Sequence, residues 1–155
     1  MKTAICYWSR HHGNTLKVLE AMAPEGDVDL IDVTTRQAVR LEGYDLVGFA
    51  SGVYYGKLHQ SVSAFARQYL PEGKPVFFVC TYGASQGKSL EALEVVAREK
   101  GCPVLGRFGC RGWDTFGPFR LVGGIAKGHP DQADLENARR FFRALRPSPP
   151  PEGAP

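Results

Sequence analysis

Runs of continuous apolar residues alternate along the chain with segments whose apolar residues recur at helical spacing. The continuous runs are TAICYWS (3–9), VDLIDV (28–33), DLVGFAS (45–51), PVFFVCT (75–81) and PVLGRFGC (103–110). Between them the period of the apolar residues changes from about two to about 3.6, which indicates strands that alternate with helices. Strands that are apolar at every position are typically covered on both faces. The pattern therefore predicts a doubly wound, mostly parallel sheet of five strands with helices on both faces.

Three amphipathic stretches predict the later helices. Their apolar stripes are Val62, Phe65, Ala66 and Tyr69, then Leu90, Leu93 and Ala97, then Leu135, Ala138, Phe142 and Leu145. A further helix is expected at LKVLEAM (16–22), directly after the first strand and a polar segment. Ser61 and Asp131 are expected to cap helix N-termini, and Gly73 and Gly101 to end helices.

Length and composition limit the class of protein. With 155 residues, 43% hydrophobic and 23% charged, the chain is expected to form one globular domain over residues 1–146. The proline-rich end, residues 147–155, has too little apolar content to pack and is expected to be disordered. No apolar stretch approaches the roughly 20 residues that span a bilayer, and the N-terminal apolar block is short for a signal peptide. We therefore expect a cytoplasmic protein with no membrane span.

The cysteines and charges add two further expectations. Cys6 and Cys80 lie in strand-like runs and Cys102 and Cys110 form no Cys-x-x-Cys pair, so all four are expected to be reduced and structural. The net charge is +3, and its basic excess lies entirely beyond Cys102. That excess is explained by solvated faces or by a docking surface for an acidic partner. Neither a basic block nor an aromatic RNA-binding signature is present, so nucleic acid is not an expected partner.

The polar segment SRHHGNT, residues 9–15, joins the first predicted strand to a helix. Ser9, Asn14 and Thr15 supply hydroxyl and amide donors, and Gly13 gives the backbone freedom to approach a ligand closely. The positive end of the following helix adds to the attraction for an anion. The segment is therefore predicted to bind an anion such as a phosphate monoester, with an ordinary capped turn as the alternative.

A metal ion is the other ligand that two histidines suggest. His11 and His12 are adjacent and poorly placed to hold one ion together, while His59 and His129 lie far away in the sequence. No His-x-x-x-His pattern or Cys/His cluster is present. No metal site is therefore expected.

Three loops together resemble those of a known family. SRHHGNT follows the first predicted strand, ASGVYYGK (50–57) the third and TYGASQG (81–87) the fourth. In this order they are similar to the three flavin-binding loops of the flavodoxin family, whose first loop usually has the form Ser/Thr-x-Thr-Gly-Asn-Thr. Gly13, Asn14 and Thr15 match that form, whereas His11 and His12 replace a threonine and a variable residue. The resemblance extends over residues 1–146.

The resemblance implies a strand order of 2-1-3-4-5 and a non-covalently bound FMN. Its phosphate would lie on the first loop and its ring between the second and third, where Tyr54 or Tyr55 could stack on one face and Tyr82 or Trp113 on the other. Trp113 and Phe116 could instead bind a partner or cover the core. The implied cofactor-binding residues are Ser9, Arg10, His11, His12, Gly13, Asn14, Thr15, Ser51, Gly52, Val53, Tyr54, Tyr55, Gly56, Thr81, Tyr82, Gly83, Ala84, Gly87 and Trp113.

The function implied by the resemblance is that of an electron carrier. A flavodoxin shuttles electrons between redox partner proteins through the semiquinone and hydroquinone states of its FMN, so no catalytic residue is expected. Gly56, or else Gly52, could turn its carbonyl toward the proton on flavin N5 because glycine tolerates positive φ. Lys57 stands where the family often carries an acid, and its charge near the ring would raise the reduction potential. This chain is mildly basic where flavodoxins are commonly acidic, so its partners are expected to differ.

Other functions fit parts of the same sequence. An FMN-dependent NAD(P)H quinone or azo reductase on the same scaffold is the main alternative, and a binding module that has lost its flavin is a third. GASQGKS (83–89) nearly forms a nucleotide-binding Walker A loop, but has three rather than four residues between its glycines. Lys88 and Ser89 are instead expected in the first turn of a helix.

Overall fold

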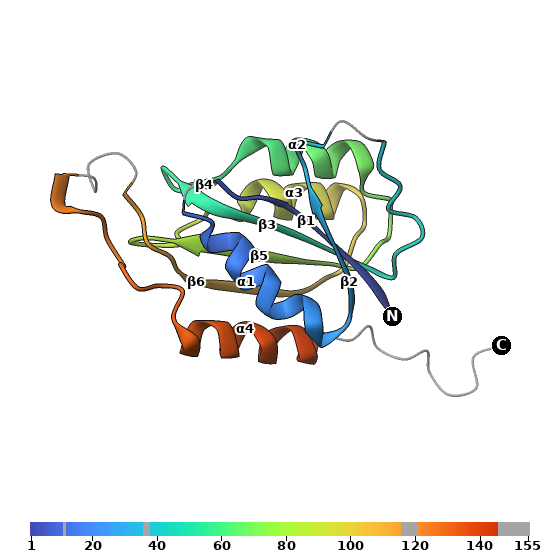
Figure 1. Cartoon of the computed structure of the whole chain (residues 1–155). Coiled ribbons are helices and arrows are strands. Elements are labelled where there is room, and N and C mark those ends of the chain that lie inside the picture. Colours follow the sequence, from blue (N-terminus) through green and yellow to red (C-terminus); the bar gives the residue numbers. More distant parts are fainter. Residues whose placement is uncertain (11, 36–37, 116–120, 146–155) are drawn as a thin grey trace.

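The structure, a computed structural model, describes residues 1–10, 12–35, 38–115 and 121–145 (Figure 1). The predicted tail 147–155, His11 and Phe116 lie outside the described residues. The described helices are α1 (Asn14–Met22), α2 (Gln60–Tyr69), α3 (Glu91–Glu99) and α4 (Gln132–Ala144), with a short 3-10 helix, η1 (Ala23–Glu25). The strands are β1 (Lys2–Trp8), β2 (Asp27–Asp32), β3 (Leu46–Tyr54), β4 (Lys57–Leu58), β5 (Val76–Tyr82) and β6 (Val104–Arg111).

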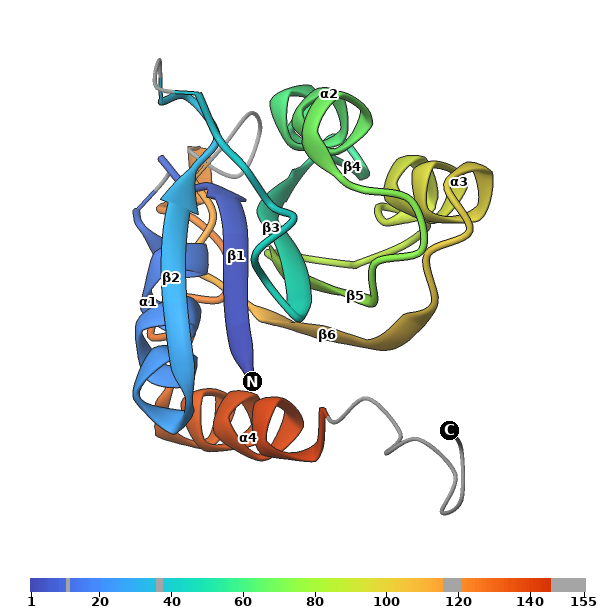
Figure 2. The same ribbon diagram turned by 90° about the vertical axis from the view of Figure 1, so that its right-hand side faces the viewer.

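The sheet has the predicted topology. Its neighbouring strands run in the order β2-β1-β3-β5-β6, and every pair along this path is parallel. This confirms the doubly wound sheet with order 2-1-3-4-5, counting the five long strands. Helices α1 and α4 cover one face and α2 and α3 the other (Figure 2). The two-residue strand β4, which the apolar pattern did not predict, pairs antiparallel with the end of β3.

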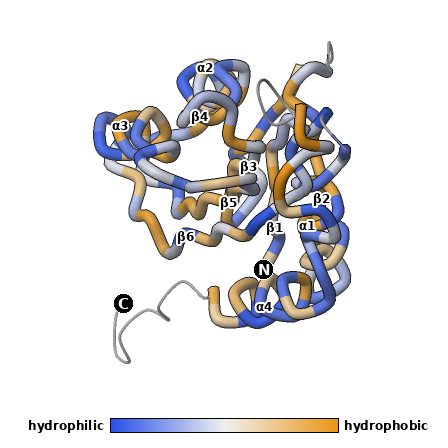
Figure 3. The backbone as a smooth tube through the Cα atoms, turned by 90° about the vertical axis from the view of Figure 1, so that its left-hand side faces the viewer, coloured by the Kyte–Doolittle hydropathy of each residue, from blue (hydrophilic) through white to orange (hydrophobic). Residues whose placement is uncertain are grey.

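Two hydrophobic cores lie on the two faces of the sheet. Phe49 and Phe78 belong to the core beneath α2 and α3, whereas Ala50 and Phe77, one residue along each strand, belong to the core beneath α1 and α4. Because successive side chains of a strand point to opposite faces, a strand with a core on each side needs apolar residues throughout. Figure 3 shows hydrophobic residues along the sheet and hydrophilic stretches on the outer sides of the helices. The edge strand β2 alternates between half-buried and exposed positions over its first residues.

The predicted caps are confirmed in part. The Asp131 side chain accepts a hydrogen bond from the Asp134 amide, and the Asp134 side chain accepts one from the Asp131 amide, which forms a capping box at α4. Gly101, at φ +64°, follows the last turn of α3 as expected. The expected cap at α2 is wrong, because the Nδ1 atom of His59 accepts from the Ser61 amide and His59 is the N-cap.

Two other local expectations are also wrong. Helix α2 already ends at Tyr69, two residues before Pro71, so Gly73 does not end it but forms a later turn at φ +73°. Proline cannot continue the hydrogen bonding of a helix, which explains the earlier end. Lys88 and Ser89 precede helix α3, which begins at Glu91, and they lie in a turn closed by the bond from the Ser89 amide to the Gln86 carbonyl.

All four cysteines are free and buried, as expected. Burial raises the pKa of the Cys6 and Cys80 thiols to about 12, so both are protonated at neutral pH. Cys102 and Cys110 are not joined to each other. Within the described residues, no helix has the length and apolar composition needed to cross a bilayer.

Gly48 allows the central strand β3 to pack against the fully buried ring of Phe77. A Cβ atom at position 48 would overlap that ring. We expect Gly48→Ala to lower the free energy of unfolding by about 1–3 kcal/mol through overpacking, measured by chemical denaturation. The matched control is Gly43→Ala, since an added Cβ at Gly43 meets nothing within 4 Å. Equal losses in the two variants would contradict the explanation.

Candidate functional site

A polar pocket opens where four neighbouring strands of the sheet end. It lies at the carboxyl ends of β1, β3, β5 and β6, and the chain leaves β1 and β3 toward opposite faces there. Such a switch in winding is where doubly wound proteins bind ligands. The lining residues are Ser9, Asn14, Thr15, Gly52, Val53, Tyr54, Thr81, Tyr82, Gly83, Gly112 and Asp114. The first nine of these are among the predicted site residues.

The segment between β1 and α1 contains two residues at positive φ. His12 (φ +58°) and the N-cap Gly13 (φ +66°) are both in the left-handed region, which turns the chain sharply into the helix. The N-cap provides no side-chain hydrogen bond, and the first turn of α1 contains no acidic residue. The Ser9 hydroxyl accepts a hydrogen bond from the Leu16 amide at 3.2 Å and so joins the end of β1 to the helix. No carboxylate of the first turn of α1 therefore compensates the positive end of this helix.

Two threonine hydroxyls connect this loop to β5. The Oγ1 atoms of Thr15 and Thr81 are 2.8 Å apart, and both side chains are buried. Both residues also line the pocket. A hydroxyl both donates and accepts, so one of the pair retains a proton to offer a ligand when the other bonds its neighbour.

Asn14 joins the loop to the segment that follows β6. Its Nδ2 atom donates to the Trp113 carbonyl at 2.7 Å, while its buried Oδ1 atom has no hydrogen-bond partner within the described residues. A Cβ atom at Gly112 would come within 2.7 Å of the Asn14 amide, so this close approach requires glycine. An orphaned buried acceptor in a pocket lining is a group that a ligand hydroxyl can satisfy.

The pocket thus combines donors and acceptors. Amides and hydroxyls lie on the α1 side, and the Asn14 Oδ1 atom and the Asp114 carboxylate are acceptors in the same lining. A Cβ atom at Gly83 would overlap Asp114, which shows how closely the loops after β5 and β6 approach. The mixture suits a ligand that carries both an anionic phosphate and hydroxyl groups.

Other predicted site residues lie outside this pocket. Arg10 turns away, with its guanidinium 3.4 Å from Asp32 and 3.2 Å from the Thr34 hydroxyl. Burial raises the pKa of the Asp32 carboxyl, but its bonds to Thr34 and Arg10 outweigh that effect and hold it below its ordinary value. Arg10 is therefore engaged by the end of β2, a strand that the sequence pattern did not connect to the loop.

The remaining described residues of the predicted set do not line the pocket. His12 stacks on Trp113 with ring centroids 4.0 Å apart, and its Nε2 atom is 2.8 Å from the Thr115 hydroxyl. Ser51 is buried and its hydroxyl donates to the Gly52 carbonyl. Tyr55 is 81% exposed. Gly56, Ala84 and Gly87 do not line the pocket, and Ala84 and Gly87 are exposed.

Sequence reasoning missed four residues at or beside the site. Gly112 and Asp114 line the pocket because the fifth long strand ends at the same edge of the sheet as the others. Trp8 and His59 form a stacked pair with centroids 3.9 Å apart, and the Tyr54 ring meets Trp8 edge-on at 5.5 Å. Burial, and then the nearby Arg10 charge, lower the pKa of His59. The sequence did place Trp8 at the carboxyl end of the first strand, and this position could have indicated that Trp8 lies beside the site.

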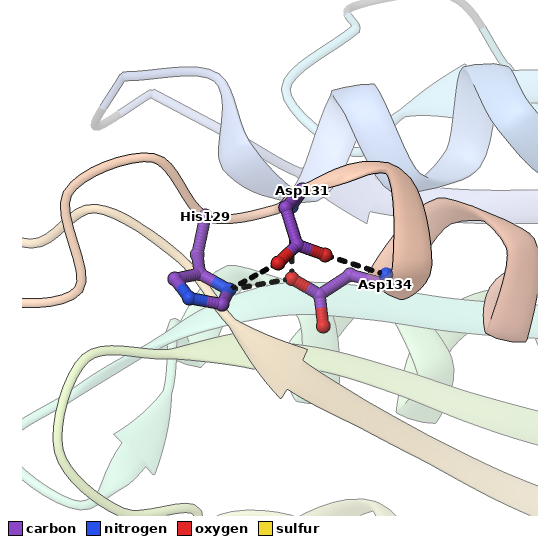
Figure 4. A group of neighbouring side chains, drawn as sticks. All are labelled: His129, Asp131 and Asp134. Atoms are coloured by element: carbon purple, nitrogen blue, oxygen red, sulfur yellow. Dashed lines mark hydrogen bonds and ion pairs between the residues drawn. The ribbon is translucent and has the colours of Figure 1, made fainter.

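One cluster of side chains has the composition of a metal site. His129, Asp131 and Asp134 bring their ligand atoms within 4.8 Å of one another at the start of α4 (Figure 4). His129 Nδ1 is 2.7 Å from an Asp134 oxygen, which also accepts from the Asp131 amide, and Asp131 accepts from the Asp134 amide. These hydrogen bonds explain the cluster as the N-terminal cap of helix α4.

Four of the six described basic residues beyond Cys102 have acidic neighbours. Arg107 pairs with Glu94, Arg143 with Glu25, and Arg139 and Arg140 with Glu136. The bonds to Arg107 are the main reason that the pKa of Glu94 is lowered. Locally balanced faces therefore explain much of the C-terminal basic excess.

The fold and the pocket are those of the doubly wound α/β class, with a polar site at the carboxyl edge of the sheet. Comparison with known proteins identifies the family within this class. The model of a flavodoxin-domain family matches residues 4–100. An uncharacterised protein of Methanocaldococcus jannaschii is 36% identical over 147 residues, which cover 94% of this chain and 98% of that protein. The chain therefore belongs to the flavodoxin family, which implies a flavin cofactor.

Solved structures agree with this fold at low sequence identity. A flavodoxin from the domain Archaea has a TM-score of 0.68 at 21% identity, covering 92% of this chain and 94% of that one. Flavodoxin 2 of Bacillus cereus has a TM-score of 0.68 at 19% identity, covering 92% and 95%. The Trp repressor binding protein of Bacillus subtilis has a TM-score of 0.69 at 16% identity, covering 94% and 100%.

The bond between Asn14 and Trp113 can be tested by changing one atom of the side chain. Asn14→Asp replaces the Nδ2 donor by an oxygen that faces the Trp113 carbonyl. We expect the free energy of unfolding to fall by about 1–3 kcal/mol, measured by chemical denaturation at neutral pH. Asn137→Asp makes the same chemical change at an exposed position of α4 and is expected to have little effect. Similar losses in both variants would count against the bond.

Proposed function

We propose that the protein binds FMN without a covalent bond and carries electrons between redox partner proteins. The observation that carries the proposal is the pocket at the carboxyl edge of the sheet. There an acid-free helix N-terminus, hydroxyl donors and the orphaned Asn14 Oδ1 atom lie together. When bound, FMN would supply one- and two-electron redox chemistry that protein side chains lack.

The first loop would hold the phosphate. The amides at the start of α1 and the hydroxyls of Ser9 and Thr15 are donors, and the helix dipole favours negative charge at this end. The Asn14 Oδ1 atom and Asp114 would accept from the hydroxyls of the sugar-alcohol chain. The lining thus suits a phosphorylated polyol, whose phosphate can accept from the donors of the loop while its hydroxyl groups donate to these acceptors.

The turn between β3 and β4 would position the ring. Tyr55 (φ +50°) and Gly56 (φ +77°) connect strands paired at Tyr54 and Lys57, and two central residues at positive φ define a type I′ turn. Positive φ is uncommon for tyrosine, and such strain often accompanies function. Exposed at the tip, Tyr55 is suited to stack on a planar ligand.

Tyr54 has a different role in this arrangement. An added Cβ at Gly52 would come within 2.9 Å of the Tyr54 hydroxyl, so the side chain folds back over its own strand. Tyr54 and Tyr82 both line the pocket. They would exclude water beside the ring.

Phosphate recognition is tested by comparing FMN with riboflavin, which lacks the phosphate. Ser9→Asp adds a negative charge to the loop, and we expect FMN affinity to fall on the order of a hundredfold while riboflavin affinity changes little. Affinities are measured by flavin fluorescence quenching. Ser85→Asp adds the same charge at an exposed position outside the pocket and should preserve the preference for FMN. A wild-type protein that is colourless and gains no stability from FMN would overturn the proposal.

The charge of Lys57 provides a second test. Lys57 follows the Tyr55–Gly56 turn and pairs with Tyr54. We expect Lys57→Glu to lower the reduction potential on the order of tens of millivolts, because a negative charge near the ring opposes added electrons. Arg98→Glu, which makes the same charge change at an exposed position in the last turn of α3, is the control in the same potentiometric titration. No downward shift at Lys57 relative to the control would exclude this tuning role.

The reductase alternative differs in its electron donor. A carrier is expected to oxidise NADH or NADPH only when a separate flavin-dependent reductase is added. Steady-state oxidation of either nucleotide with a quinone, by the purified FMN-loaded protein alone, would favour the alternative. The measurement follows the loss of nicotinamide absorbance.

A further inference from the structure

His59 joins the start of helix α2 to the ends of two strands of the sheet. Its ring stacks on that of Trp8, with the ring planes 4° from parallel and the centroids 3.9 Å apart. Its backbone amide donates to the hydroxyl of Ser51, a fully buried residue of β3, at 3.1 Å. Its Nδ1 atom accepts from the Ser61 amide at 3.2 Å and so caps α2. One residue therefore holds β1, β3 and α2 together at the carboxyl edge of the sheet.

The partners of His59 stand directly beside the lining of the polar pocket. Trp8 is the last residue of β1, next to the loop proposed to hold the phosphate. Ser51 precedes the lining residue Gly52 and donates to its carbonyl at 2.8 Å. The ring of Tyr54, a further lining residue at the end of β3, meets the Trp8 ring edge-on. His59 is thus placed to fix the phosphate loop and the strand that leads to the ring-binding turn, without lining the pocket itself.

The cap of α2 fixes the protonation state of the His59 ring. A backbone amide can only donate a hydrogen bond, so Nδ1 must be without a proton to accept from Ser61. The Ser61 hydroxyl, 2.7 Å from the same Nδ1 atom, can donate or accept and fits either state. The neutral ring therefore carries its proton on Nε2. Protonation at Nδ1 would turn the acceptor into a donor that faces the Ser61 amide, and the first turn of α2 would lose its cap.

The charges around His59 oppose its protonation. Arg10 lies over the Trp8 ring at 5.8 Å and is paired with Asp32, so a protonated His59 would place a second cation against the same indole. The side chains that surround the stacked pair from β3 and α2 carry hydroxyl groups that are uncharged at neutral pH, namely Ser51, Tyr54 and Ser61. Burial, and then the Arg10 charge, lower the pKa of His59. The stabilisation by its neutral ring is therefore complete above the ordinary histidine pKa of 6.5 and declines as the pH falls below it.

We propose that neutral His59 is a positioning residue of the flavin pocket, and that its protonation in mildly acidic solution weakens FMN binding. The identity of the ligand rests on the proposed function, and the role of the ring rests on the contacts of His59. Protonation at Nδ1 removes the cap of α2 and adds a charge that repels Arg10 beside Trp8. The phosphate loop and the strand before the ring-binding turn then lose a common support. FMN affinity and the stability of the flavin-free protein therefore decline together.

The state of the ring is tested first in the flavin-free full-length protein. Nitrogen-15 NMR of the histidine rings distinguishes the two neutral tautomers, and the signal of His59 is assigned by its loss in His59→Asn. We expect a proton on Nε2 and a titration midpoint below 6.5, because the fold opposes the charged form. A proton on Nδ1 in the neutral ring, or a midpoint at or above 6.5, would overturn the proposal.

Two variants then separate the cap from the stack. His59→Asn retains an oxygen that can cap α2 but does not titrate, whereas His59→Phe retains a ring for Trp8 but has no acceptor. Between about pH 7.5 and about pH 5.5, we expect the Kd of FMN to rise about fivefold more for the wild type than for His59→Asn. At the higher pH, His59→Phe should bind FMN about fivefold more weakly than the wild type and His59→Asn within about twofold. The FMN phosphate itself titrates at about pH 6, but it does so with every variant, so the comparison between variants cancels this effect.

His129→Asn is the matched control, because His129 bonds Asp134 at the cap of α4 and does not line the pocket. It should retain the pH dependence of the wild type. Equal pH dependence in the wild type and His59→Asn would exclude the role of His59, whatever the absolute affinity. If no flavin binds at any pH, the proposed function fails. The NMR tautomer, and a urea midpoint that falls with pH more in the wild type than in His59→Asn, still decide the role of the ring.

Discussion

The candidate site depends on the close approach of loops that follow different strands. Asn14 and the Trp113 carbonyl are 99 residues apart in the sequence and 2.7 Å apart in space, and Thr15 and Thr81 are joined in the same way across 66 residues. Parallel strands make this approach systematic, because all their carboxyl ends meet at one edge of the sheet. Gly112 allows the approach because it has no Cβ atom, which would lie within 2.7 Å of the Asn14 side chain. The pocket is thus a consequence of tertiary contacts made by polar side chains, with the sheet as a rigid support.

The architecture could be predicted from the sequence because it depends on a pattern repeated many times. Each strand needs apolar residues on both faces, and Phe77 and Phe78, which belong to opposite cores, show why alternation is absent. The pattern of strand ends indicated which loops meet at the site, and the resemblance of these loops to the flavodoxin family then named nine residues that line the pocket. Features that depend on single partners could not be read from this pattern. The place of Arg10 is decided by Asp32, and the cap of α2 by the His59 ring, neither of which any periodicity reports.

The residues that the sequence analysis missed also depend on individual contacts and not on a repeated pattern. Asp114 lies after the last strand, where the sequence is rich in glycine and aromatic residues and gives no spacing rule for the side chain that enters the pocket. The turn at Lys88 and Ser89 was mistaken for helix because its residues are compatible with either structure. Here the Ser89 amide bonds the Gln86 carbonyl, and the regular helix starts only at Glu91. The difference in free energy between a turn and the first turn of a helix is small, so contacts with the rest of the structure decide which of the two forms.

The β3–β4 hairpin lies between the polar pocket and a cavity beside α2, at the carboxyl edge of the sheet. Tyr54, the last residue of β3, lines the polar pocket, and Gly56, two residues further, lines the cavity beside α2. The turn between them is fixed on both sides by the pairing of Tyr54 with Lys57 and Val53 with Leu58. A ligand that moves the turn from one side therefore changes the geometry on the other. Lys57, which lines the cavity, would therefore act from that side on the flavin ring that we propose beside the turn.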